Sequence, residues 1–390
     1  MDKMVKECGL CRSEGFEVLW NLPNFPFTER FGSYSADFAK GSDQTLLICR
    51  TCGHVQLGIQ INPETLYDAS YSFRTGQSAT ATMGSAIFID FLNRVSGSRR
   101  FSSALDIGGN DQYLAQQIKS RANKVCVIDP VCTGFDGKTV DGVKIIGRFI
   151  ESVDLARDLD APDLVICRHT LEHISDPYKV VAQVLTQCRD DGLFVFEIPC
   201  LEGLSEGLRF DAVFHQHLHY FDLGGLQRLV AESGGRWIGH FYNHQGSCGG
   251  ALLFAFAKSK EKTPITKTDT PAKIVALRKR IALFQSQMTV TSELLTSMIP
   301  PVYGYGASLM LATLAYHMKT DFSNLACILD DDPGKHGLEY ANLPVKVGYT
   351  KKVEIPENAF FLITSQENTR PIYKRIMELT PRRVLIPIPI

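Results

Sequence analysis

The sequence predicts an α/β protein built around a doubly wound, mostly parallel sheet, with a small cysteine-bearing module before it and a second α/β unit after it. Short apolar runs alternate with amphipathic segments through the middle of the chain. This alternation is typical of parallel strands joined by helices on both faces. A second strand–helix series begins near residue 301, whereas residues 1–62 are irregular and carry two cysteine pairs.

The composition is ordinary for a globular protein and excludes several classes of partner. The 390 residues are 44% hydrophobic and 21% charged, with a formal net charge of −1. Because there is no basic excess, we expect no nucleic-acid partner. No apolar run approaches the ~18 residues of a membrane span, so we expect no membrane partner either. The N-terminus lacks an apolar signal core, which favours a cytoplasmic location.

The first module, residues 1–62, carries two CxxC units. They are Cys8-x-x-Cys11 and Cys49-x-x-Cys52. Four converging thiolates form a closed tetrahedral Zn²⁺ site, which is structural because no position is left for substrate. The 11 cysteines are an odd number without a signal sequence, which argues against a disulfide framework. Unrelated core cysteines and a redox pair are the alternatives to zinc.

The second unit, residues 63–260, begins with a helical segment and continues with strands such as SSALDIGG and KVCVIDP. The first of these strands ends in Gly108 and Gly109, and such a turn lets a ligand approach the backbone closely. Asp129 ends the second strand, where a carboxylate can accept hydrogen bonds from a ribose. Asp106 before the turn disfavours a phosphate, so the pattern favours a cationic nucleoside. Tight strand–helix packing is the alternative explanation.

A linker helix is expected over residues 261–300, followed by a Rossmann-like unit over residues 301–390. The segment YGYGAS is a glycine turn that enters a helix, and backbone N–H groups at such a turn suit a phosphate. A packing domain without any ligand is an equal alternative, and an independent NAD site is a more distant one.

The segments LDIGGNDQYL and ICRHTLEHISDP resemble the nucleoside-binding and fourth-strand motifs of class I methyltransferases. Together with the CxxC pairs and YGYGAS, the chain resembles sugar C-methyltransferases that act on nucleotide-linked 4-keto-deoxysugars. The resemblance covers nearly the whole chain and implies S-adenosyl-L-methionine as the methyl donor. The residues that it assigns to the donor site are Tyr71, Asp106, Gly108, Gly109, Asn110, Asp129, Phe149, Arg168 and His169.

The same resemblance assigns catalysis to the segment FHQHLHYF, where the family reads Tyr-His-Glu-His. Its last histidine, His217, is the expected base, because a neutral imidazole can take the C3 proton beside the ketone. Gln216 or His215 is the expected donor to the developing oxyanion. Phe214 and Gln216 depart from the family pattern, so either the acid–base task is redistributed or the substrate differs. Alternatively, the histidines satisfy backbone groups in a buried loop.

The resemblance also implies that the C-terminal unit holds the nucleotide of the sugar substrate. The candidate substrate residues are Phe214, His244, Tyr305, Gly306, Ser308 and Asp330. Met310 stands where the family has a lysine, and Cys248 stands where it has a histidine. We therefore expect C-methylation of the sugar. An O- or N-methyltransferase of another small metabolite and a non-catalytic, zinc-bearing binding protein are the alternatives. The sequence does not set the oligomeric state.

Overall fold

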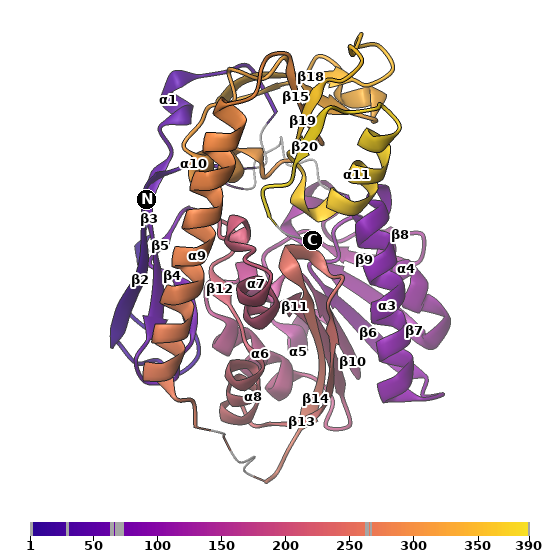
Figure 1. Ribbon diagram of the computed structural model, residues 1–390. Helices are drawn as coiled ribbons and strands as arrows, with labels where there is room; N and C mark the ends of the chain where they lie inside the picture. Colours follow the sequence, from indigo (N-terminus) through magenta and orange to yellow (C-terminus); the bar gives the residue numbers. More distant parts are fainter. Residues whose placement is uncertain are drawn as a thin grey trace.

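The computed structural model describes residues 3–28, 31–62, 66, 74–261, 265 and 267–388. Within these ranges the chain forms three main sheets, arranged as a central α/β unit, an N-terminal sheet on its flank and a C-terminal α/β unit above it (Figure 1). No helix in the described part of the chain combines the length and the apolar character that crossing a bilayer requires.

The central sheet confirms the predicted doubly wound, mostly parallel arrangement. Five of its strands run parallel, and the last strand in sequence, β14, is inserted antiparallel between β11 and β13. In spatial order the strands are β13 (Gly235–Asn243), β14 (Ala251–Lys258), β11 (Leu193–Pro199), β10 (Leu164–Arg168), β6 (Phe101–Ile107), β7 (Ala122–Ile128), β9 (Val143–Ile146) and β8 (Thr139–Val140).

Helices cover both faces of this sheet, because successive strand residues point to opposite sides. Ala104 packs in one buried cluster with α3 (Ala79–Ser96) and α4 (Tyr113–Ile118). The next residue, Leu105, packs in another cluster on the opposite side. That side is covered by α5 (Leu155–Asp158), α6 (Pro177–Gln187) and α8 (Leu223–Glu232). A short helix, α7 (Leu201–Glu206), follows β11.

The C-terminal unit has a second, smaller parallel sheet with one antiparallel edge strand. Its strands, in spatial order, are β17 (Glu339–Tyr340), β18 (Leu343–Tyr349), β16 (Ile328–Asp330), β15 (Val302–Tyr305), β19 (Phe360–Ile363) and β20 (Arg383–Leu385). The helices α10 (Leu311–Met318) and α11 (Thr369–Met377) belong to this unit. Because β15 lies between β16 and β19, the chain leaves it first to one side and then to the other, which is a Rossmann-like arrangement.

The N-terminal sheet includes a strand from the central unit. Its order is β12 (His219–Tyr220), β4 (Val55–Leu57), β3 (Ser42–Cys49) and β2 (Phe16–Phe25), and a separate pair joins β1 (Lys3–Met4) to β5 (Ile59–Gln60). The short helix α1 (Ala36–Ala39) precedes β3. Since β12 begins two residues after His217, the pairing of His219 with Gln56 ties the predicted catalytic segment to this module.

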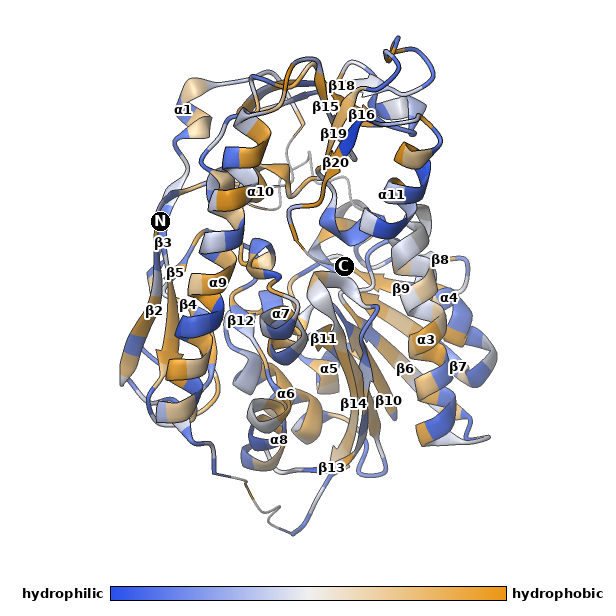
Figure 2. Ribbon diagram, viewed as in Figure 1, coloured by the Kyte–Doolittle hydropathy of each residue, from blue (hydrophilic) through white to orange (hydrophobic). Residues whose placement is uncertain are grey.

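A single long helix, α9 (Thr270–Thr296), occupies most of the predicted linker and runs along the molecule from the base of the N-terminal sheet toward the C-terminal unit (Figure 1). One face of α9 is buried in a cluster that also contains residues of β2, residues 210–220 and the C-terminal unit. Figure 2 shows hydrophobic strands inside and hydrophilic residues on much of the outside, as expected for a water-exposed molecule.

Candidate active site

A cavity of about 730 Å³ lies where the carboxyl ends of the two parallel sheets face each other. The central sheet contributes the residues that follow β6, β7 and β10, and the C-terminal sheet contributes those that follow β15 and β19. Ligands of open α/β sheets bind at this edge, at the point where the strand order reverses. Of the predicted site residues, the cavity is lined by Gly108, Asn110, Asp129, Phe149, Arg168, His169, Phe214, His217 and Ser308.

The glycine turn after β6 is shaped so that only glycine fits at its first position. Gly108 has φ +75°, and a Cβ added there would lie 1.9 Å from Thr170 Oγ1. A Cβ on Gly109 would meet the side chain of Val127 at 2.8 Å, so this residue packs against β7 and does not line the cavity. The turn therefore presents the backbone of Gly108, which has no side chain, to the cavity, with Asn110 beside it.

Asp129 holds the turn together and presents its carboxylate at the cavity wall. Its Oδ2 accepts a hydrogen bond from the backbone N–H of Asn110 at 2.8 Å, and its Oδ1 accepts one from Val131 at 2.8 Å. Burial raises the pKa of Asp129 above its usual value, although these N–H groups act in the opposite direction. Each oxygen retains a lone pair for a ribose hydroxyl. Phe149, 43% exposed, lies at the rim where a flat base could stack.

Asp106 lies behind the turn and does not line the cavity. It is 2% exposed, and a Cβ on Gly109 would meet its Oδ2 at 2.9 Å. Burial and the nearby Asp129 raise the pKa of Asp106 to about 7. The backbone of the turn thus stands between Asp106 and the position expected for the methyl donor, so the side chain of Asp106 does not reach it directly. Tyr71, the remaining predicted donor-site residue, lies outside the described residues.

Alternating charges form one wall of the cavity after β10. Arg168 donates from Nε to Glu197, and His169 lies between two carboxylates, with Nδ1 3.5 Å from Glu172 and Nε2 3.6 Å from Glu197. Burial lowers the pKa of His169, but the two carboxylates outweigh burial and raise it to about 9. His169 is consequently a cation near pH 7. It also has a left-handed backbone, φ +49°, and backbone strain of this kind is common at functional sites.

His217, 5% exposed, faces this wall. Its ring centroid lies 4.8 Å from that of His173 and 4.1 Å from that of Phe214. Burial, reinforced by the charges of His173 and His169, lowers the pKa of His217 well below its usual value. The imidazole is therefore neutral near pH 7, which is the state a general base requires.

Glu172 and His173 line the cavity beside His217, and neither is among the site residues predicted from the sequence. His173 Nδ1 lies 2.8 Å from the carbonyl oxygen of Gln216, which can only accept, so Nδ1 carries the hydrogen and Nε2 the lone pair. Glu172 is 1% exposed, and within the described structure neither carboxylate oxygen accepts a hydrogen bond. Ligand atoms of Glu172, His173 and His217 lie within 4.8 Å of one another, close enough to share a proton or a metal ion.

The other two predicted catalytic side chains point away from the cavity. His215 donates from Nε2 to the carbonyl oxygen of Phe25 at 3.0 Å, and its ring packs against that of Phe27. Gln216 Oε1 accepts a hydrogen bond from the hydroxyl of Thr28 at 3.1 Å. Both side chains instead fasten the segment to the N-terminal module. The predicted oxyanion donors are thus engaged elsewhere, because residues 214–217 form a turn, closed by the hydrogen bond from the backbone N–H of His217 to the carbonyl oxygen of Phe214 at 3.0 Å, and both side chains of its middle residues face the N-terminal module.

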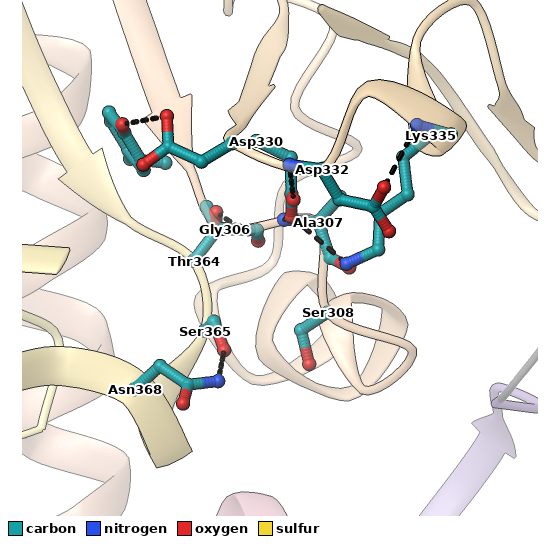
Figure 3. Close-up of polar contacts among 12 residues, drawn as sticks. Gly306, Ala307, Ser308, Asp330, Asp332, Lys335, Thr364, Ser365 and Asn368 are labelled. Carbon is teal, nitrogen blue, oxygen red and sulfur yellow. Dashed lines mark hydrogen bonds and ion pairs between the residues drawn. The ribbon is translucent and has the colours of Figure 1, made fainter. Parts of the chain in front are cut away.

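The glycine turn of the C-terminal unit uses its polar groups internally (Figure 3). Asp330 accepts hydrogen bonds from the backbone N–H of Ala307 at 2.8 Å and from Lys335 Nζ at 3.0 Å. Tyr305 is buried, and its hydroxyl donates to Asp331. The cavity does not reach Tyr305, Gly306 or Asp330. The carboxylate of Asp330 therefore already binds the backbone N–H group and the lysine charge that this turn could offer to a phosphate.

The cavity wall between the two units is completed by an ion-pair network. Arg209 donates to Asp211 at 2.9 Å and to Glu367 at 2.7 Å, and Glu367 also accepts from the backbone N–H of Cys248. His244 is exposed and stacks on the ring of Tyr242, so it does not line the cavity. Cys248 does line it.

The four cysteines of the N-terminal module converge on one point. The Sγ atoms of Cys8 and Cys52 are 3.6 Å apart, as are those of Cys11 and Cys49. Tetrahedral zinc with Zn–S bonds of about 2.3 Å places its sulfurs roughly 3.8 Å apart. The donor set and its spacing therefore fit Zn²⁺.

Comparison with known proteins agrees with this geometry. The family described as "Methyltransferase domain" matches residues 82–236. The strand order of the whole central sheet, with β14 antiparallel between β11 and β13, is that of the class I, S-adenosylmethionine-dependent type of fold.

The chain is also similar to individual methyltransferases. The C-methyltransferase NovU from Streptomyces niveus is 25% identical over 246 residues, which cover 61% of this chain and 58% of NovU. The N-methyltransferase NodS from Bradyrhizobium japonicum WM9, solved with S-adenosyl-L-homocysteine, is 14% identical. The match covers 51% of this chain and 96% of NodS, with a TM-score of 0.37. A 1,6-didemethyltoxoflavin-N1-methyltransferase from Burkholderia thailandensis is 15% identical and covers 47% of this chain and 80% of its own, with a TM-score of 0.35.

Proposed function

We propose that this protein transfers a methyl group from S-adenosylmethionine to a carbon atom of a nucleotide-linked 4-keto-deoxysugar. The observation that supports this most is that a buried, neutral imidazole, His217, shares one cavity with the glycine turn at Gly108 and with Asp129. The match to a C-methyltransferase supports the choice of carbon as the acceptor atom.

The residues of the cavity fit the parts of such a donor. Asp129 would hold the ribose, the rim residue Phe149 the adenine, and the turn at Gly108 and Asn110 the methionine part. Bound there, S-adenosylmethionine supplies an electrophilic methyl group on a sulfonium.

This chain's own residues would make the acceptor carbon nucleophilic. The ketone acidifies the C–H bond beside it, and His217 takes that proton, leaving the electron pair on carbon for the new C–C bond. The cationic imidazole of His169 lies on the wall that His217 faces and can stabilise negative charge on the ketone oxygen. Glu172 and His173 adjoin His217 and can receive the proton afterwards.

We further propose that Cys8, Cys11, Cys49 and Cys52 hold a structural Zn²⁺. The site lies in the N-terminal module, and its sulfurs have the separation that tetrahedral coordination requires. When bound, the ion would fix the ends of β3 and β4.

The test uses S-adenosylmethionine with a ¹³C-labelled methyl group and a panel of nucleoside-diphosphate 4-keto-6-deoxysugars. We expect a product whose labelled methyl is bonded to carbon by NMR, and we expect His217→Ala to reduce turnover by at least about 100-fold. His244→Ala is the matched control, because this exposed histidine lies outside the cavity. A label on oxygen or nitrogen would replace the proposal with the O- or N-methyltransferase alternative.

A further inference from the structure

The long helix α9 carries apolar residues on two opposite faces. The buried face, which includes Ile274, Ile281 and Met288, packs into the interior. The opposite face is exposed and follows the helix for five turns. We define the outer row of α9 as Val275, Lys279, Leu283, Ser286, Val290 and Glu293.

The outer row is unusual for a helix face in water. Val275 is 69% exposed, Leu283 44% and Val290 49%. A helix on the surface of a single globular chain normally has a polar outer face, whereas half of the outer row is apolar and exposed. Figure 1 shows α9 lying lengthwise on the surface of the molecule, where another molecule can reach it.

The charges in the outer row indicate what covers it. Lys279 lies seven residues before Ser286, and Glu293 lies seven residues after it. Among the ion pairs of the described residues, neither Lys279 nor Glu293 takes part. Neighbouring basic residues are engaged: Arg278 pairs with Glu17, and Arg280 donates to a carbonyl oxygen. The outer row therefore has one unpaired charge of each sign at equal distances from a small central residue.

We propose that α9 pairs with α9 of a second copy of this chain, antiparallel and centred on Ser286. Seven residues of helix span about 10.5 Å, so this pairing sets each Lys279 against Glu293 of the other copy, twice per dimer. It also brings Leu283 and Val290 into a shared apolar seam on both sides of the small serine. Parallel pairing would set like charges against each other, which the arrangement disfavours.

The experiment is sedimentation velocity on the full chain, at protein concentrations from about 1 to 100 µM, a range that brackets micromolar dissociation constants. We expect wild type to reach twice the mass of one 390-residue chain. Lys279→Glu and Glu293→Lys should each weaken the dimer at least about tenfold, because each sets like charges together. The double variant Lys279→Glu/Glu293→Lys should restore dimerisation.

Lys351→Glu, at an exposed lysine in the C-terminal unit, is the matched control and should sediment as wild type does. Thermal unfolding of each variant shows that folding is intact. The proposal is overturned if wild type sediments as a single chain, if the single reversals leave a dimer unaffected, or if the double variant stays dissociated. None of these outcomes depends on the methyl acceptor.

Discussion

At the scale of single residues, Asp129 combines two tasks in one carboxylate. It closes the glycine turn through Asn110, and it stands at the cavity wall as the proposed ribose acceptor. We predict that Asp129→Ala weakens the binding of S-adenosylhomocysteine at least about tenfold, since hydrogen bonds to a charged group contribute about 1.5–3 kcal/mol. Isothermal titration calorimetry checks this, with the exposed Asp141→Ala as control. Equal affinity of wild type and Asp129→Ala would contradict the assignment.

Glu172 is a buried carboxylate of which neither oxygen accepts a hydrogen bond in the described structure. Its negative charge stands 3.5 Å from His169 and 3.9 Å from His173. We predict that Glu172→Gln lowers kcat about 10- to 100-fold, because it removes the charge that keeps His169 protonated. Affinity for S-adenosylhomocysteine should change less than about threefold. A variant with wild-type kcat would show that this carboxylate takes no part in the reaction.

At the scale of elements, the N-terminal module and the catalytic segment share one sheet. Because β12 pairs with β4, which follows Cys49 and Cys52, loss of the proposed zinc should loosen the segment that carries His217. We predict that Cys49→Ser abolishes zinc binding, measured by elemental analysis, and lowers Tm by several degrees or more. Cys327→Ser, at a half-buried cysteine of the C-terminal unit, should retain the metal. One zinc per chain in Cys49→Ser would refute the four-sulfur site.

The elements themselves were largely predictable from sequence. Apolar runs such as 104–107 and 164–167 are buried strands of the parallel sheet, and the turn at Gly108 lies at its reversal point, as expected. The direction of individual side chains was not predictable. His215 and His217 stand two residues apart, yet one packs against the N-terminal module and the other lines the cavity, because the loop between them is irregular. Glu172 and His173 could have been found, since they lie within five positions after the assigned residues Arg168 and His169.

At the scale of the whole molecule, histidines that are buried in their neutral form make the free energy of unfolding depend on pH. His317 stacks on Trp20 with ring centroids 5.0 Å apart, and burial lowers its pKa to about 3. The unfolded chain, with a histidine pKa near 6.5, therefore takes up a proton first as the pH falls. The contribution of His317 to the free energy of unfolding is therefore present above the unfolded pKa of about 6.5. It is progressively lost below that pH, by about 2 kcal/mol at pH 5.

We accordingly predict that the free energy of unfolding of His317→Phe falls less steeply between pH 7 and pH 5 than that of wild type, by about 2 kcal/mol. Urea denaturation at several pH values measures both slopes. Parallel slopes would mean that His317 is protonated in the folded protein.

The most direct test of the whole account is a crystal structure of this protein with bound S-adenosylhomocysteine. We predict its ribose on Asp129, its amino-acid part on the backbone at Gly108 and Asn110, and its sulfur facing the imidazole of His217 across the open cavity. A complex in which His217 turns away from the sulfur, or in which this cavity stays closed to the ligand, would contradict the proposed reaction.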